Sequence, residues 1–345
     1  MRRLGQTPAW FPVALVVAAA YLLAPVLGTD YLFEAILLPF LALSLAAVGL
    51  NLLTGYTGQV SLGSAAFLAI GAYAAFNLNL RVAGLPLPVT ILSAGAVAAL
   101  IGVAFGLPSL RLKGFYLAVS TLAAQFFVQW ALTKFPWFSN DSNSGVIDAP
   151  ELRVAGFGFT TPLGRYYFTL TVVMLLTAFA WRLVSVKAGR DFMAVRDHET
   201  AAKIIGVPVL RAKLVAFATS SFIIGVAGVL WAFAYLRTVE PDGFNLDRSF
   251  QILFIVIVGG LSTIRGSFLG AALIVVLPLL LSRLSAALFG GGIDSGSLDM
   301  IQRIFLGVLI IGFLIAEPDG LAALLQRVAG GLAGRARRLT SPSAR

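Results

Sequence analysis

Long apolar stretches dominate the pattern of hydrophobic and polar positions along the chain. Each is continuous over more residues than a membrane-barrel strand, in which apolar and polar residues alternate over about ten positions, so helices are favoured. A helix needs about 20 apolar residues to cross a bilayer. Ten candidate crossings follow, over residues 10–27, 31–53, 60–77, 88–107, 115–132, 166–186, 214–236, 250–261, 268–281 and 301–316. The pattern predicts an all-α, polytopic membrane helical bundle of about ten transmembrane segments.

The first and the short later runs need separate treatment. Run 10–27 follows Arg2 and Arg3, as in a signal peptide, but it is longer than a usual signal core, so we expect a retained helix. Runs 250–261 and 268–281 are short and flank a Gly-rich turn, so half-helices or a re-entrant pair stand as alternatives to full crossings. Residues 1–330 then form one transmembrane domain. The tail 331–345, rich in Arg, Gly and Ser, is expected to be disordered.

Composition narrows the class of protein further. A chain that is 59% hydrophobic and 12% charged is not typical of soluble proteins. The absence of cysteine excludes disulfides and thiolate metal sites, and the single histidine, His198, cannot build a polyhistidine metal site. The dipeptide Gly-Lys never occurs, so the chain has no phosphate-binding P-loop. Any nucleotide chemistry must come from a partner.

The basic residues predict the orientation in the membrane. With the loops placed alternately on the two sides and both termini in the cytoplasm, 17 of the 25 Lys and Arg residues fall inside. Only five of the 15 acidic residues do so. The net charge of +10 therefore indicates attraction to anionic lipid at the cytoplasmic face and not a nucleic-acid partner.

Most polar residues inside the apolar runs are neutral. The ionisable Glu34 and Arg182 lie near the ends of their runs, within reach of the interface. Glycine and neutral polar side chains gather between 49 and 73, where a broken helix would expose backbone groups to a pathway. The candidate translocation path comprises Asn51, Thr54, Gly55, Gly58, Gln59, Ser61, Gly63, Ser64, Gln125, Gly259, Gly260 and Gly266. For any single polar residue, a hydrogen bond between helices is the competing interpretation.

The segment 186–214 is too long for a simple turn and is expected in the cytoplasm. Asp197 is a candidate N-cap, and Gly206 followed by Pro208 marks the end of a short helix. Ala201, Ile204 and Ile205 form an apolar stripe along that helix, which must be buried against lipid headgroups or a protein, and Ala201 with Ala202 would fit a groove. A cytoplasmic ATPase is the expected partner. On the other side, the loop 133–165 is long enough to meet a partner.

Five motifs, in order, resemble one family. They are Gly49 to Gly63 with Ile70 to Tyr73, Leu110 to Ala118 with Thr121 to Ala123, Arg196 to Val207, Gly259 to Gly266 with Gly270 and Ala271, and Pro318 to Leu321. They are similar to the permease subunits of ATP-binding-cassette (ABC) importers for branched-chain amino acids, of the M-subunit type. The resemblance covers nearly the whole chain after the first helix.

The resemblance implies a multi-pass permease of the bacterial inner membrane that works as part of a complex. A homologous second permease, two cytoplasmic ABC ATPases and a periplasmic substrate-binding protein are the implied partners. ATP and Mg would be bound by the ATPases, and no cofactor by this chain, which is not itself an enzyme. The coupling motif carried over by the resemblance comprises Arg196, Asp197, His198, Glu199, Ala201, Ala202, Ile204, Ile205 and Gly206.

Two departures leave alternatives open. Ser64 stands where the family often has His, and Thr200 separates Glu199 from the Ala pair. An importer for urea, short amides or another small neutral solute therefore remains beside the branched-chain amino acid importer. An ion-coupled carrier or passive channel is the alternative of another class, although ion coupling would require ionisable groups at mid-membrane. A purely structural membrane subunit is the third alternative.

Overall fold

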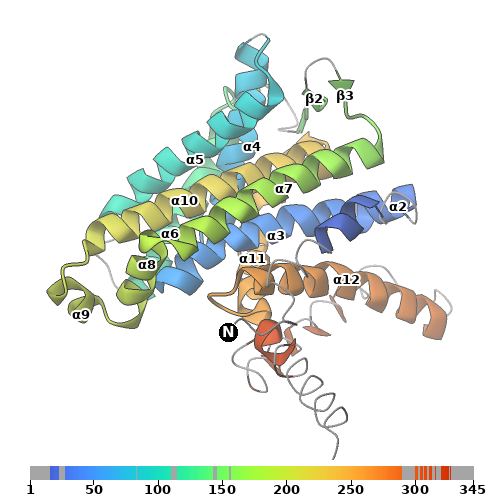
Figure 1. The fold of residues 1–345 in the computed structure, drawn as a ribbon. Coiled ribbons are helices and arrows are strands. Elements are labelled where there is room, and N and C mark those ends of the chain that lie inside the picture. The colour runs from blue at the N-terminus through green and yellow to red at the C-terminus, as the bar shows by residue number, and fades with distance from the viewer. Residues whose placement is uncertain are drawn as a thin grey trace, which may run out of the picture.

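The computed structural model describes residues 16–22, 28–82, 84–109, 115–142, 146–154, 157–289 and separate positions between 300 and 327. Most of the first predicted helix, the motif residues 110–114, 318 and 319, and the tail 331–345 lie outside the described residues. The described chain is built almost entirely of helices, which confirms the all-α prediction (Figure 1).

The elements follow the chain in a simple order. The helices are α2 (Asp30–Leu32), η1 (Phe33–Leu37), α3 (Leu38–Asn51), η2 (Leu52–Tyr56), α4 (Ser64–Arg81), α5 (Leu87–Ser109), α6 (Phe115–Lys134), α7 (Pro162–Ser185), α8 (Lys187–Asp197), α9 (Glu199–Ile204), α10 (Val209–Val229), η3 (Leu230–Leu236), η4 (Pro241–Phe244), α11 (Leu246–Gly259) and α12 (Ile264–Phe289). The strands β1 (Ile147–Asp148) and β4 (Thr238–Val239) pair antiparallel, as do β2 (Arg153–Val154) and β3 (Phe157–Gly158).

Among the described residues, five helices are long and apolar enough to cross a membrane: Asp30–Tyr56, Leu87–Leu107, Pro162–Ser185, Val209–Leu236 and Ile264–Arg283. These five support a polytopic membrane protein, while the total of about ten crossings stays a prediction. With 14 residues, α11 is about 21 Å long at 1.5 Å per residue, shorter than the ~30 Å hydrocarbon core.

The half-helix interpretation is wrong for run 268–281. The helix α12 begins at Ile264, directly after the Gly-rich turn, and continues for 26 residues through Pro278. It is therefore long enough to cross. The run of apolar residues is shorter than α12 because Arg265, Gly266 and Ser267 interrupt the apolar pattern without interrupting the helix.

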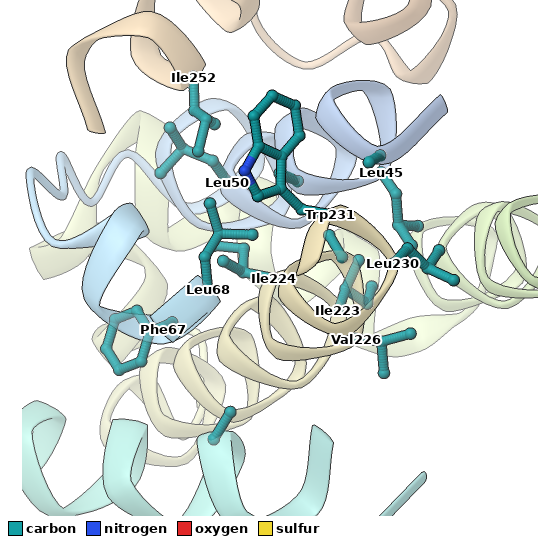
Figure 2. Packing of buried hydrophobic residues seen from close by; sticks show 14 of the residues in the cluster. Leu45, Leu50, Phe67, Leu68, Ile223, Ile224, Val226, Leu230, Trp231 and Ile252 are labelled. Carbon is teal, nitrogen blue, oxygen red and sulfur yellow. The ribbon is translucent and has the colours of Figure 1, made fainter. Parts of the chain in front are cut away.

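The span Asp30–Tyr56 is the centre of the bundle. In its apolar stretch 83% of the residues are buried, compared with 22% in the apolar stretch of Pro162–Ser185. A helix that is apolar on every side is expected to be enclosed, and α3 lies between α7 and α10 on one side and α11 and α12 on the other (Figure 1). Figure 2 shows side chains from several helices meeting there. They include Leu50 of α3, Leu68 of α4, Ile224 of α10, Trp231 of η3 and Ile252 of α11.

The crossing of α4 and α10 depends on glycine. A Cβ atom on Gly71 would collide with the backbone of Gly225, including its carbonyl oxygen. The two backbones therefore touch without side chains between them, as is common where membrane helices pack closely.

The loops gather at the two ends of the bundle. The coupling segment α8–α9 lies at one end, and the β2–β3 hairpin lies at the other (Figure 1). We call these the α9 end and the β end. Arg196 contacts Gly55 and Ser262 at the α9 end, whereas Arg81 contacts Trp137 at the β end. Segments predicted to share a side of the membrane thus share an end of the bundle.

Candidate coupling and translocation site

The predicted polar cluster lies at a break between two helices. The helix that begins at Asp30 ends at Tyr56, and α4 begins only at Ser64, so residues 57–63 lie between the two helices. The break is closed by its own side chains. Thr54 Oγ1 donates to the carbonyl of Gln59 at 3.1 Å, and Gln59 Nε2 donates to Thr57 Oγ1 at 3.2 Å. Run 60–77 therefore begins four residues before its helix does.

Asn51 joins this break to the second Gly-rich turn. Its Nδ2 donates to the carbonyl of Thr263 at 2.9 Å and to Ser267 Oγ at 3.2 Å. Its Oδ1 accepts from the backbone N–H of Ser262 at 2.9 Å. The Oγ of Ser262 in turn donates to the carbonyl of Gly55 at 2.7 Å. The two Gly-rich points that the sequence singles out are therefore in direct contact.

The glycines of the second turn lie where α11 passes into α12. Gly259 is the last residue of α11, Gly260 is its C-cap, and Gly266 lies in the first turn of α12. A Cβ atom on Gly259 would collide with the carbonyl oxygen of Gly266. The two helices therefore meet in a tight hairpin beneath Asn51.

Gln125 of α6 holds the start of α4. Its Oε1 accepts from the backbone N–H of Ala66 and, at 3.2 Å, from Ser249 Oγ, while its Nε2 donates to the carbonyl of Phe244 at 2.8 Å. Ser249 Oγ also accepts from the backbone N–H of Ala65 at 2.9 Å. Side chains of α6 and α11 thus satisfy backbone donors that the first turn of a helix leaves unpaired.

Gln59, Ser61 and Ser64 are also buried in this region, whereas Gly58 is exposed. Ser61 Oγ accepts from the backbone N–H of Gly63 at 3.4 Å. Ser64 Oγ and Gln59 Oε1 are buried and have no hydrogen-bond partner among the residues that the structure describes. Asn51 and Gln125, by contrast, are engaged in contacts between helices. That these residues line a translocation path stays a prediction.

The coupling segment consists of two helices and not one. The helix α8 continues to Asp197, whose following residue His198 donates its backbone N–H to the carbonyl of Ala194 at 3.1 Å. The cap position of α9 is therefore His198, and the prediction of Asp197 as N-cap is wrong. The helix α8 was not predicted from the sequence, although Phe192 and Val195, three residues apart, are its buried face.

The end of α9 follows the prediction. Gly206 has a φ of 86°, and its backbone N–H donates to the carbonyl of Lys203 at 3.2 Å. Ile204 and Ile205 are 81% and 74% exposed, so the described chain does not cover the apolar stripe. Ala202, in contrast, is buried against its own chain and does not line a groove for a partner. Ala201 is exposed beside the stripe.

Glu199 and Lys213 fix α9 to α10. Lys213 Nζ lies 2.9 Å from Glu199 Oε2, and the Lys213 side chain is only 9% exposed. Lys213 is not among the predicted site residues. It lies 14 residues after Glu199 in the chain, and no local pattern shows that α10 folds back beneath α9.

Arg196 faces the bundle and links α8 to the break. Its Nη1 donates to Ser262 Oγ at 2.5 Å and to the carbonyl of Gly55 at 3.4 Å, and its guanidinium pairs with Asp197 at 2.8 Å. Gly58, with a φ of 69°, lies beneath it, and a Cβ there would come within 3.0 Å of Arg196 Cγ. One side chain therefore touches both the coupling segment and the two Gly-rich turns.

A cavity of about 360 Å³ lies between the break and the coupling segment. Gly58 and Gln59 line it from one side, and Arg196, Glu199 and Lys213 from the other. Among the described residues, no group of three or more His, Asp and Glu side chains is placed to hold a metal ion. The arrangement joins the surface helices α8 and α9 to the helices of the bundle.

Fold and site together define an all-α, polytopic membrane protein in which a broken helix contacts the surface helix α8 through Arg196. The chain belongs to the family described as "Branched-chain amino acid transport system / permease component", whose match covers residues 32–314. The resemblance drawn from the motifs is thereby confirmed.

Individual relatives agree on the class and differ in named substrate. The chain is 31% identical over 297 residues to the high-affinity branched-chain amino acid transport system permease protein LivM of Salmonella typhimurium, and equally to that of Escherichia coli. The match takes in 79% of this chain and 66% of each relative, so the chain spans just under two thirds of their length. It is also 30% identical, over 76% of its length and 73% of the relative's, to the autoinducer 2 import system permease protein LsrC of an Enterobacter species.

Proposed function

We propose that this chain is the membrane permease subunit of an ATP-driven importer that carries branched-chain, hydrophobic amino acids across the bacterial inner membrane. A homologous permease, two cytoplasmic ABC ATPases and a periplasmic binding protein complete the complex. Family membership and the names of two relatives support this proposal. The observation that carries it is the exposed apolar face of α9, which is connected through Arg196 to the broken helix.

The coupling step follows from those contacts. An ATPase that binds the exposed Ile204 and Ile205 takes hold of a helix fixed to α10 by the Glu199–Lys213 pair. Movement of α8 and α9 then displaces Arg196, and with it Ser262 and the carbonyl of Gly55. Because those groups contact the end of the helix at the break, their displacement opens the chain at residues 57–63. Coupling of this kind requires no covalent step in the permease.

The distribution of charge favours a neutral or zwitterionic solute. In the five candidate spans, every Asp, Glu, Lys and Arg lies near one end. A zwitterionic amino acid needs no net charge along its path, and backbone groups freed at the break offer donors and acceptors. An ion-coupled carrier would instead need ionisable groups at depth.

The test is uptake by the complete transporter in proteoliposomes. Radiolabelled leucine, urea and an autoinducer-type solute are offered separately, with and without ATP. ATP-dependent uptake of leucine supports the proposal. Uptake of only another solute keeps the permease architecture and rejects the substrate, and Ser64→His then shows whether that position changes the preference. Uptake by this chain without ATPases rejects the mechanism.

A further inference from the structure

A second cavity, of about 570 Å³, lies at the β end of the bundle. It is formed where the β1–β4 pair meets the beginning of α7 and the end of η3. Ligand pockets in proteins commonly have volumes of about 300–1,000 Å³. Its lining combines four charged residues with an apolar wall: Asp148, Glu151, Arg165, Arg237, Phe159 and Phe233. We call it the outer pocket.

Arg165 is a buried cation with an unused donor. Its side chain is 6% exposed, its Nη1 donates to the carbonyl of Ala234 at 3.0 Å, and its Nη2 pairs with Glu34. Glu34, predicted to be a boundary residue, is thus the partner of this guanidinium. The Nε of Arg165 is buried and has no hydrogen-bond partner among the described residues. Buried donors of this kind are rarely left unpaired, and Arg165 lines the outer pocket, so this N–H is available to an acceptor on a ligand there.

Arg237 and Asp148 are brought together by the small sheet. The backbone N–H of Ala149 donates to the carbonyl of Arg237 at 2.9 Å, and Asp148 lies opposite Thr238. Arg237 has a φ of 63°, a conformation uncommon outside glycine and concentrated at functional sites. Both side chains are exposed, and within the described parts of the chain neither forms an ion pair. The lining of the pocket thus includes one cation and one anion that have no ion-pair partner among the described residues.

We propose that the outer pocket binds a free amino acid with an apolar side chain as a zwitterion. Arg237 and Arg165 receive its carboxylate, Asp148 receives its ammonium group, and Phe159 with Phe233 contacts its side chain. A cation and an anion beside an aromatic wall match the carboxylate, the ammonium group and the apolar side chain of such a ligand. This assignment rests on the proposed substrate class and adds the place where the permease itself holds the solute, at the end of the bundle away from α9.

Equilibrium binding to the assembled transporter tests the pocket. Both permeases and the ATPases are placed in nanodiscs without the binding protein, and tritiated leucine is titrated. Arg237→Gln and Asp148→Asn should each raise the Kd at least tenfold, whereas Arg237→Lys should stay near wild type. Isoamylamine, which lacks the carboxylate, and 4-methylpentanoate, which lacks the ammonium group, should each compete at least tenfold more weakly than leucine.

Two variants outside the pocket are matched controls. Lys134→Gln and Asp141→Asn remove the same charges from exposed positions at the β end and should leave the Kd unchanged. An unchanged Kd in both pocket variants, or no saturable leucine binding to wild type, would overturn the pocket even when ATP-driven leucine uptake proceeds. Absence of that uptake in the complete transporter counts against the proposed function instead. Variants that impair only binding-protein-dependent uptake would assign these charges to docking of the binding protein, which also overturns the proposal.

Discussion

At the scale of single residues, Arg196 carries the connection between the coupling segment and the broken helix. Arg196→Gln removes the charge and shortens the side chain, so its contacts with Ser262 and Gly55 are lost. We expect the transporter to assemble and to hydrolyse ATP, while leucine uptake per ATP falls at least tenfold. Uptake and phosphate release, measured in the same proteoliposomes, give this ratio.

Arg190→Gln is the matched control for Arg196. Arg190 is exposed on the same helix, α8, so its replacement removes the same charge from the same element. Its ratio of uptake to ATP hydrolysed should equal that of wild type. A wild-type ratio in the Arg196 variant would show that the coupling motion does not pass through this side chain.

The hydrogen bonds of Gln125 should contribute measurably to the stability of the folded protein. Gln125→Leu keeps the volume but leaves the N–H of Ala66 and the carbonyl of Phe244 without this partner, and each buried unpaired group costs ~1–3 kcal/mol. The unfolding temperature in detergent should fall by several degrees. Gln129→Leu, one turn away and only partly buried, should change it little. Equal temperatures for the two variants would contradict the account of Gln125.

The residue types of the site were predictable from the sequence, but their partners were not. Glycine and neutral polar groups between 49 and 73 stand out in an apolar chain, whereas nothing local indicates that Asn51 bonds Ser262 and Thr263, more than 200 residues away. Hydrogen bonds of that separation depend on how the helices pack. Lys213 and Arg165 were missed as site residues for the same reason.

At the scale of elements, helix endings were predicted better than helix beginnings. Gly206 stops α9 because a positive φ suits glycine at that position. Asp197, in contrast, looked like a cap only because α8 had been overlooked, and α12 looked short because polar residues occupy its first turn. A polar residue can begin a helix, end one or lie within one, and only its neighbours in space decide which.

The contact between α4 and α10 offers a test at this scale. Gly71→Ala places a methyl group against the backbone of Gly225, which cannot give way, so the two helices must separate. We expect a large loss of folded protein, measured as the monodisperse fraction after detergent extraction and as the unfolding temperature.

Gly307→Ala provides the comparison for this substitution. Among the described residues, nothing lies within 4 Å of a Cβ at Gly307, a helical position, so alanine should be neutral or slightly stabilising there. If both variants fold equally well, the close approach of α4 and α10 is not required.

At the scale of the whole molecule, the all-α class followed from the length of the apolar runs, and the alternation of loops placed the right segments at the same end. Hydropathy is a property of each segment alone, which is why it found the helices. It carries no information on which helix is central, so the enclosure of α3 emerged only from the packing. The exposed apolar faces that remain, such as Leu175 on α7 and Ile204 on α9, mark where lipid or partners must lie.

The account depends most on the claim that a separate ATPase acts on α9. The chain contains no cysteine, so Ile204→Cys introduces a single labelling site for a benzophenone maleimide. Leu175→Cys, similarly exposed at 67% on the membrane span α7, is the matched control. In transport-competent complexes, illumination should link the ATPase to the permease labelled at position 204 and not at position 175. Equal yields from both positions, or no ATPase product from position 204, would contradict the account.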